Sequence, residues 1–327
     1  MTAPSLRLLL STLLDYTGLL SSTAPALPTA VAAYERYSAS SHRWMLGRLV
    51  LPLSQLSQFE DCLDHLDRTY SAAFWPLSIV LEPSHQALDR LAPWLKKQDR
   101  FTISALEFKL GNTEANCQVS ASAIASLLPH LPPHSDLFFD VPLDTSLPTY
   151  LDVLQGTRAA VNIYTGGLTK THSPNSKTLA QGIVACANAH IPFKTTPVSA
   201  CHPLANWQTL SNGTAIATPG FLNIALAAAC AYGYGVTAAE IETILQINTP
   251  ENLIFSAQEI ICHSPFYSQE ATLSNVVRHL PLEVLANVRS RYFLGVSSYS
   301  FQTPIADLCR LGFLPEVLPM PSYAFSS

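Results

Sequence analysis

The sequence predicts an α/β protein of the (β/α)8 TIM-barrel type, with an accessory helical N-terminus. Short apolar segments alternate with segments of helical periodicity, and successive strands begin roughly 30 residues apart, the size of a βα unit. The strand segments are continuously apolar, which is typical of a parallel sheet that is buried on both faces. An open doubly wound sheet is the alternative. No G-x-G-x-x-G motif follows the first predicted strand, which weakens a dinucleotide-binding interpretation.

Residues 1–43 are predicted to be helical and to lie outside the barrel. The segment Leu6–Leu20 is rich in leucine, but Arg7 and Asp15 interrupt it. It is too short to cross a bilayer, and its weak positive charge argues against a signal peptide. We therefore expect an amphipathic helix that packs on the body of the protein, followed by a second helix over 29–37.

The barrel domain is predicted to span residues 44–314, and a proline-rich tail follows over 315–327. The spacing between strands widens after the sixth one, across a polar loop at 197–219. The predicted strands are Trp44–Leu51, Leu77–Leu81, Phe101–Phe108, Leu137–Val141, Ala159–Tyr164, Ile191–Thr195, Asn252–Ser256 and Tyr292–Ser297. The predicted helices between and after them are Leu56–Tyr70, Ala87–Leu95, Ile124–Leu131, Leu147–Leu154, Thr178–Ala189, Phe221–Tyr232, Ala238–Ile247, Leu282–Arg291 and Ile305–Leu311.

The composition excludes several classes of protein. Hydrophobic residues make up 48% of the chain and charged residues 13%, which suits a large core and excludes a disordered chain. The net charge is −5 and no Lys/Arg run occurs, so nucleic acid is not an expected partner. Seven cysteines are scattered without a C-x-x-C, which indicates reduced thiols and a cytoplasmic protein. We expect no membrane association, no metal and no cofactor; a small-molecule ligand is the expected partner, and the oligomeric state is not predicted.

Lys194 is the central catalytic candidate. It lies in the apolar segment P-F-K-T-T, near a strand end where barrel active sites form. Burial is expected to lower the pKa of its amine, and a neutral amine can attack a carbonyl to form a Schiff base, as in class I aldolases. Glu107 or Asp140 at other strand ends would carry protons. The competing interpretation is a structural ion pair between Lys194 and one of these acids.

Three further groups are predicted near the same end of the barrel. The backbone N–H groups of Thr165, Gly166 and Gly167 are candidates for binding a phosphate or carboxylate, and a tight turn is the alternative. Ser297 and Ser298 end the last predicted strand, where barrels often bind phosphate, or they make ordinary strand-end hydrogen bonds. His202 is a candidate acid or base in the loop after Lys194. No other histidine has metal-ligand spacing.

The second half of the chain resembles a family of uncharacterised bacterial proteins with a barrel-like fold. That family has K-x-R-T-G-G after one strand, P-F-K-A-T-A-G-L-H-H after the next, then H-G-F-L-N and F-G-S-x-S-F-x-E-P. The corresponding segments here lie within residues 159–223 and 292–312 and keep the same order. They are N-I-Y-T-G-G (Asn162–Gly167), P-F-K-T-T-P-V-S-A-C-H (Pro192–His202), P-G-F-L-N (Pro219–Asn223) and V-S-S-Y-S-F-Q-T-P (Val296–Pro304).

The chain departs from that family pattern at four positions. Asn162 and Tyr164 stand where the family has Lys and Arg, Cys201 stands where it has the first His, and Thr303 replaces Glu. The resemblance implies a barrel and the location of a site, but no specific chemistry. The loss of the two basic residues favours a member whose ancestral activity is altered or absent.

Two functional hypotheses follow from the sequence. In the first, the protein is a lyase of the aldolase type, with a Schiff-base lysine, or an isomerase, and it acts on a small carbonyl or phosphorylated metabolite. In the second, it is a non-catalytic binding or scaffold protein that retains the barrel. Lys194 is central to the first hypothesis, and Asn162 and Tyr164 favour the second.

Overall fold

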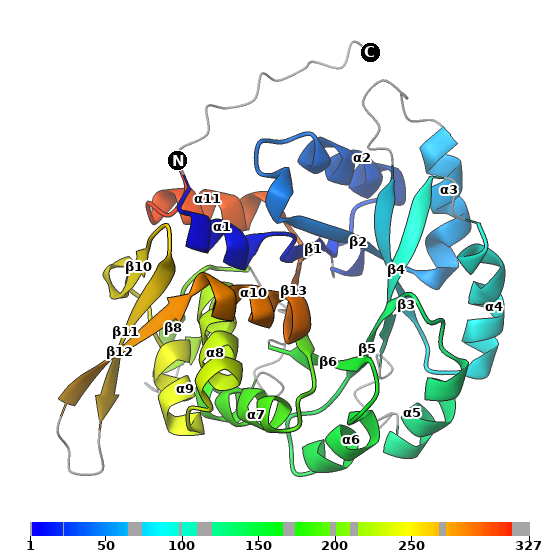
Figure 1. Ribbon diagram of the computed structural model, residues 1–327. Helices are drawn as coiled ribbons and strands as arrows, with labels where there is room; N and C mark the ends of the chain where they lie inside the picture. The colour runs from blue at the N-terminus through cyan, green and yellow to red at the C-terminus, as the bar shows by residue number, and fades with distance from the viewer. Residues whose placement is uncertain are drawn as a thin grey trace.

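A closed barrel of eight parallel strands organises the molecule (Figure 1). The computed structural model describes residues 2–21, 23–64, 74–97, 100–109, 120–165, 174–196, 201–209, 215–267 and 273–315. The strand order around the barrel is β1-β13-β7-β6-β5-β4-β3-β2, and each neighbouring pair is parallel. The prediction of a (β/α)8 TIM-barrel-like fold is confirmed by this strand order.

Seven of the eight barrel strands agree with segments predicted from the sequence, within about two residues at most ends. The continuous apolar runs form buried parallel strands, as their composition indicates. The barrel strands are β1 (Leu14–Tyr16), β2 (Leu46–Pro52), β3 (Trp75–Leu81), β4 (Phe101–Phe108), β5 (Asp136–Asp140), β6 (Ala159–Tyr164), β7 (Phe193–Thr196) and β13 (Phe293–Ser298).

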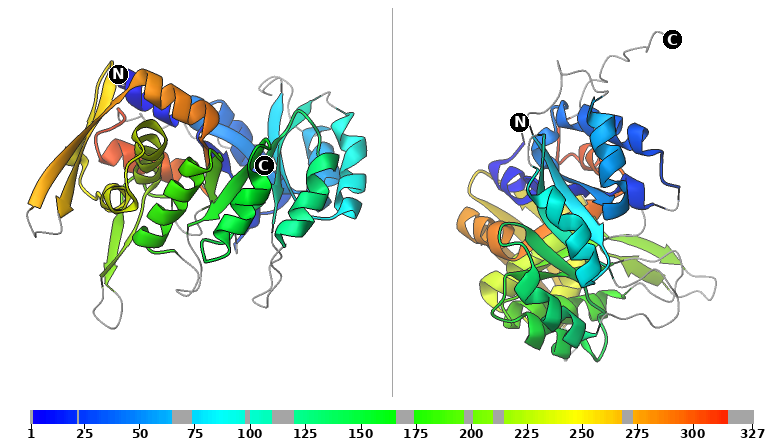
Figure 2. Two further views of the ribbon diagram at one scale, coloured as in Figure 1. Left: turned by 60° about the horizontal axis from the view of Figure 1, so that its bottom comes forward. Right: turned by 90° about the vertical axis from the view of Figure 1, so that its right-hand side faces the viewer.

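Helices surround the barrel and cover the outer face of its strands (Figures 1 and 2). The α-helices are α1 (Pro4–Leu10), α2 (Leu27–Ser38), α3 (Leu56–Asp64), α4 (His85–Leu95), α5 (Ala121–Leu127), α6 (Leu147–Leu154), α7 (Ser176–Asn188), α8 (Phe221–Tyr234), α9 (Ala238–Leu245), α10 (Leu282–Arg291) and α11 (Gln302–Arg310). Short 3-10 helices are η1 (Gly18–Leu20), η2 (Arg43–Met45), η3 (Leu53–Gln55), η4 (Leu128–His130) and η5 (Pro250–Asn252).

The layer between strands and helices is the main apolar core. Side chains alternate along a strand, so every second residue points outward into this layer. Leu49 and Leu106 are fully buried there, and the rings of Phe108 and Phe139 stack with centroids 4.7 Å apart. This layer explains why the strands and helices were recognisable from their apolar residues alone.

The start of the barrel corrects the prediction for residues 1–43. The segment Leu6–Leu20 is not one helix, because α1 ends at Leu10 and Leu14–Tyr16 forms β1. β1 pairs with β13 on one side and β2 on the other, and so closes the barrel. The N-terminal region therefore supplies a barrel strand and is not a purely accessory helical extension. A three-residue strand with an aspartate at its centre carries too little local signal to be separated from a leucine-rich helix.

The seventh predicted strand also needs correction. Residues 252–256 contain β10 (Leu253–Phe255), but β10 pairs antiparallel with β11 (Glu259–Tyr267), outside the barrel. β12 (Leu273–Pro281) completes a three-stranded sheet whose β11–β12 hairpin projects from the body (Figures 1 and 2). The total of eight barrel strands was right only because β1 takes the place of this segment.

The polar loop predicted at 197–219 contains two short strands. They are β8 (Asn206–Thr209) and β9 (Ala215–Thr218), which pair in a two-stranded sheet. The rest of the connection from β7 to β13 consists of α8, α9 and α10, which agree with predicted helices, and the three-stranded sheet. Despite this length, β13 lies directly beside β7 in the barrel. Among the described residues, none of the helices combines the length and the apolar character that crossing a membrane requires.

Candidate functional site

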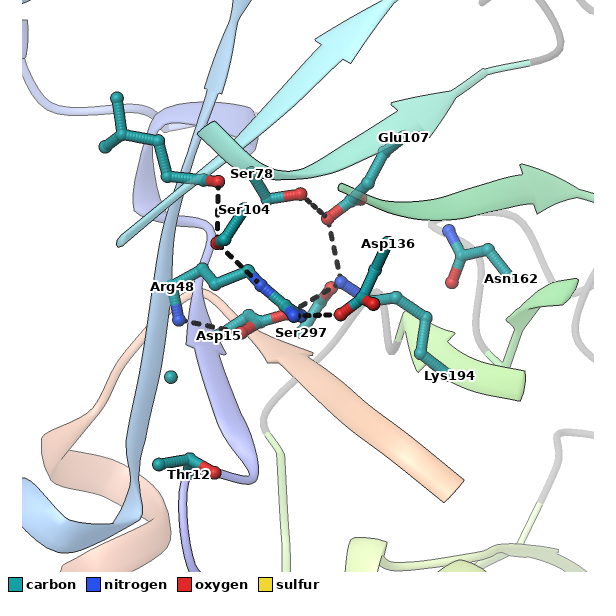
Figure 3. Close-up of polar contacts among 12 residues, drawn as sticks. Thr12, Asp15, Arg48, Ser78, Ser104, Glu107, Asp136, Asn162, Lys194 and Ser297 are labelled. Atoms are coloured by element: carbon teal, nitrogen blue, oxygen red, sulfur yellow. Dashed lines mark hydrogen bonds and ion pairs between the residues drawn. The ribbon is translucent and has the colours of Figure 1, made fainter. Parts of the chain in front are cut away.

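A buried cluster of charges occupies the inside of the barrel around Lys194 (Figure 3). Lys194 Nζ lies 2.8 Å from Asp15 Oδ2 and 2.8 Å from Glu107 Oε1, and all three side chains are buried. Ser78 Oγ donates a hydrogen bond of 2.7 Å to Glu107 Oε1. The four residues come from β7, β1, β4 and β3, so the cluster connects strands from opposite sides of the barrel.

The structural ion pair that was the alternative for Lys194 is present, but with one partner that the sequence analysis missed. Glu107 is a partner as expected, Asp140 makes no direct contact with the amine, and Asp15 is the second partner. Asp15 also accepts a hydrogen bond of 2.8 Å from the backbone N–H of Arg48. A Cβ at Gly47 would meet Asp15 Oδ1 at 2.4 Å, so only glycine leaves room for this carboxylate.

The prediction of a neutral Lys194 amine is wrong. Burial alone lowers the pKa of Lys194, but the charges and hydrogen bonds of Asp15 and Glu107 outweigh burial and raise it above its usual value. The same ion pair lowers the pKa of Asp15. Burial raises the pKa of Asp15, yet Lys194 and Arg48 outweigh burial and hold the pKa below its usual value. Lys194 and Asp15 are therefore both charged at neutral pH.

The charged cluster extends toward the N-terminal ends of the strands through Arg48. The Arg48 guanidinium donates to Ser104 Oγ at 3.1 Å and to the carboxylate of Asp136, the first residue of β5. Its guanidinium carbon lies 5.9 Å from the ring centroid of Phe138, and Lys194 Nζ lies 5.0 Å from the same centroid. Phe138 thus contacts both cations inside the barrel, where cation–π attraction favours the charged forms.

A second polar cluster follows the C-terminal ends of β5, β6, β7 and β13; we call Asp140, Asn162, Thr196 and Ser297 the mouth arc. Asn162 Nδ2 donates to Asp140 Oδ1 at 2.6 Å, and Thr196 Oγ1 donates to Asn162 Oδ1 at 2.9 Å. Ser297 Oγ lies 3.3 Å from Thr196 Oγ1. Because active sites of (β/α)8 barrels form at this end of the strands, the mouth arc is the candidate active site.

Asp140 is the titratable member of the mouth arc. Burial raises the pKa of Asp140 to about 6, against the opposing effects of Lys109 and of the hydrogen bond from Asn162. A carboxyl group with this pKa exists in both protonation states near neutral pH, which is the property a general acid–base needs. The environment of Asp140 therefore suits the proton-carrying role predicted for it. Glu107, the other predicted proton carrier, instead accepts hydrogen bonds from Lys194 and Ser78.

His202 lies at the same end of the barrel and has a carboxylate partner that the sequence did not indicate. His202 Nδ1 is 2.6 Å from Asp307 Oδ2 on α11. Its neighbour Cys201 is buried; burial raises the pKa of the Cys201 thiol to about 12, although a hydrogen bond with Ser298 opposes the shift. This thiol is therefore not a nucleophile at neutral pH.

The predicted anion-binding groups are only partly described. Gly166 and Gly167 lie outside the described residues. Thr165 is buried, and its backbone N–H, which was a candidate anion donor, donates to Thr196 O at 3.1 Å. Ser298 Oγ donates to Ser300 O, which agrees with the ordinary strand-end hydrogen bonding that was the alternative there. Ser297 belongs to the mouth arc.

Asn162 and Tyr164, the two residues that favour the non-catalytic hypothesis, lie in different environments. Asn162 is buried and donates a hydrogen bond to Asp140, whereas Tyr164, at the end of β6, is 42% exposed. Among the described residues, no group of three or more His, Cys, Asp or Glu side chains is arranged to hold a metal ion. The mouth arc offers one carboxyl, one amide and two hydroxyl groups, which suit hydrogen bonding to a small polar ligand.

Comparison with known proteins adds little to this geometry. No family model matches the chain, and no curated protein matches it. Among solved structures, 11 chains match. One is described as the crystal structure of the Bacillus cereus spore cortex-lytic enzyme SleL; it is 12% identical, with a TM-score of 0.35 over 93% of this chain and 67% of that chain. A likeness at this level carries no argument about activity, and the fold assignment depends on the strand order.

Proposed function

We propose that the protein is a barrel enzyme that catalyses proton transfer on a small carbonyl or phosphorylated metabolite bound at the mouth arc. The observation that carries the proposal is the position of Asp140, which ends β5 and is bonded to Asn162 at 2.6 Å. Asp140 acts as the general acid–base. An isomerase, or a lyase that proceeds through an enolate, belongs to this class of reaction.

The surroundings of Asp140 support this role. Asn162 donates to one carboxyl oxygen of Asp140, and Thr196 donates to the amide oxygen of Asn162. No described residue makes a hydrogen bond to the second carboxyl oxygen, which can therefore bind a substrate. Positioned carboxyl groups whose pKa lies near the working pH contribute about 10²–10⁴-fold to a rate. The fully buried cluster beneath the arc supplies a rigid base for it, because each member has a hydrogen-bond partner.

Lys194 serves in this proposal as an electrostatic anchor. Attack on a carbonyl would require its amine to leave Asp15 and Glu107 and to lose a proton that both carboxylates stabilise. Treatment with borohydride in the presence of dihydroxyacetone phosphate or pyruvate is therefore expected to give no adduct on Lys194, measured by mass spectrometry. An adduct at this residue would restore the aldolase-type mechanism.

Exchange of carbon-bound hydrogen in D2O tests the proposal. The protein is incubated with glycolaldehyde, dihydroxyacetone, dihydroxyacetone phosphate and pyruvate, and deuterium on the carbon next to the carbonyl is followed by NMR. Asp140 removes a proton from this carbon, and a deuteron returns to the enolate. We expect exchange with at least one compound and a loss of about 100-fold or more in Asp140→Asn. Asp152→Asn, an exposed aspartate on α6, is the matched control and should exchange normally.

The alternative is a binding protein that keeps the barrel without catalysis. Tyr164, exposed in place of a basic residue, is the observation that favours it. If a compound of the panel raises the thermal midpoint but shows no exchange above buffer, the binding function replaces the enzymatic one. Exchange that persists in Asp140→Asn would also contradict the proposal.

A further inference from the structure

The pair His202 and Asp307 has the geometry of a proton-transfer dyad. His202 Nδ1 lies 2.6 Å from Asp307 Oδ2, and the other oxygen of Asp307 accepts a hydrogen bond from Arg310. The Asp307 side chain is only 9% exposed, whereas that of His202 is 39% exposed. A carboxylate at Nδ1 holds the Nδ1–H tautomer, which leaves the lone pair on Nε2. No described residue makes a hydrogen bond to Nε2.

The backbone around His202 is fixed more firmly than a loop usually is. The carbonyl oxygens of His202 and Pro203 each accept a hydrogen bond of 2.9 Å from the first N–H groups of α8, which otherwise lack partners. A Cβ at Gly220 would meet the Pro203 carbonyl at 2.3 Å, so this close contact requires glycine. Cys201 and Leu204 are buried on either side. The exposed imidazole is thus held on a rigid backbone.

The dyad lies at the same end of the barrel as the mouth arc, next to β13. Cys201 forms its hydrogen bond with Ser298, the residue after Ser297 of the arc. Asp307 is on α11, the helix that follows β13. The dyad and the mouth arc therefore both lie at the C-terminal ends of the barrel strands, where barrel active sites form.

We propose that His202, held by Asp307, is a second proton-transfer residue of the mouth and that the substrate is an α-hydroxy carbonyl compound. The inference rests on the proposed function of Asp140. Asp140 moves the carbon-bound proton from C2 to C1. His202 Nε2 accepts the proton of the C2 hydroxyl and returns it to the C1 carbonyl oxygen. An aldose becomes the isomeric ketose: C1 is reduced, C2 is oxidised, and no other reactant is needed.

The histidine tautomer provides the first test and needs no substrate. Long-range ¹H–¹⁵N spectra of the full chain should show protonated Nδ1 and unprotonated Nε2 for His202. Asp307→Asn should favour the opposite tautomer, since its amide can donate to Nδ1. Wild-type His202 with its proton on Nε2 would overturn the proposal, and this result does not depend on how any variant folds.

The rate of chemical modification also reports the tautomer of His202. Diethyl pyrocarbonate acylates an unprotonated imidazole nitrogen, and peptide mapping gives the rate for each histidine. His279 is the matched internal control, because its Nδ1 lies 3.1 Å from Glu259 on the projecting sheet, away from the mouth. Asp307→Asn should slow modification of His202 by about tenfold and leave His279 unchanged. Equal rates at His202 in both proteins would contradict the fixed tautomer.

An isomerisation assay distinguishes failure of the role of His202 from failure of the proposed function. Glyceraldehyde and its phosphate are the probes, and conversion to the ketose is followed by NMR beside deuterium exchange. His202→Gln is expected to lose isomerisation by about 100-fold while His279→Gln keeps it. If Asp140→Asn abolishes exchange but His202→Gln isomerises normally, the proposed function stands and the role of His202 is refuted. If wild-type protein neither exchanges nor isomerises these probes, the proposed function fails whatever the tautomer.

Gly220→Ala tests the anchoring of His202 without altering either member of the dyad. The added methyl must displace the Pro203 carbonyl and with it the backbone of His202. We expect a fall in turnover with little change in substrate KM. Gly156→Ala, at an open position with φ of +75°, controls for loss of stability. Unchanged turnover in Gly220→Ala would show that the position of His202 is not required.

Discussion

The two sides of the barrel strands differ sharply in what they bury. Outward-pointing residues such as Leu106 and Phe139 enter a continuous apolar layer beneath the helices. Inward-pointing residues form only a small apolar cluster of Ala105, Phe138 and Ala160, next to the charges of Asp15, Lys194 and Glu107. The interior of a (β/α)8 barrel is commonly filled by branched aliphatic side chains. Here the outward side of the strands is apolar, and the inward side carries ion pairs and hydrogen bonds.

This difference separates folding from function along the same strands. In β4, Leu106 packs against the helices while the adjacent Glu107 binds Lys194. Hydrophobic contacts are non-directional and tolerate substitution, whereas a buried ion cluster depends on every partner. We therefore expect inward and outward substitutions to have distinct effects on stability, pH dependence and activity.

The largest effect is expected from Lys194→Met. The variant removes the cation that Asp15 and Glu107 share and leaves two buried acidic side chains without it, at a cost of about 3–5 kcal/mol in the free energy of unfolding. Urea denaturation at pH 7 provides the measurement. A loss below about 1 kcal/mol would show that the cluster is hydrated or rearranges.

A slightly smaller loss is expected from Leu106→Ala on the outward side. Removal of a fully buried leucine side chain costs about 2–5 kcal/mol, through lost transfer free energy and the cavity that remains. The same denaturation experiment should show this loss at pH 5 and at pH 8 alike, since no charge changes. A strong pH dependence would mean that the two sides of the strand are coupled.

Asp140→Asn should increase the free energy of unfolding at high pH, whereas the two preceding substitutions decrease it. The pKa of Asp140 is about 6 in the folded protein and its ordinary value is 3.8, so the folded state binds more protons between these values. Stability due to this group therefore falls as the pH rises from about 4 to 6. The variant should be about 1–2 kcal/mol more stable than wild type at pH 8, with little difference at pH 3.5. Denaturation curves at both pH values check the sign.

The smallest effect is expected from Lys97→Ala. Lys97 pairs with Glu60 outside the barrel, and its side chain is 50% exposed. Exposed ion pairs contribute about 0–1 kcal/mol because water screens both charges. Comparison with Lys194→Met places a surface pair and a buried cluster on one scale. A Lys97 effect as large as that of Lys194 would remove the distinction between interior and surface charges.

The outward side of the fold was predictable from local signals in the chain. The apolar runs of β2 to β7 and β13, the helical periodicity between them, and their spacing were sufficient to predict the barrel, because these signals are local. Lys194 and Asp140 were recognised as site candidates for a related reason. A charged residue at the end of an apolar strand is visible in the sequence, and parallel strands end on one face.

Which charged residues meet depends on how the barrel closes. Asp15 is 179 positions from Lys194, and Asp307 is 105 positions from His202. Neither distance leaves a local pattern in one sequence, and β1 is too short to be recognised before the barrel closes around it. Barrel closure brings β1 against β13 and β2, and this contact converts an aspartate in a leucine-rich segment into the partner of a buried lysine. The closed barrel therefore determines which charged residues pair, whereas the local sequence determines most of the helices and strands.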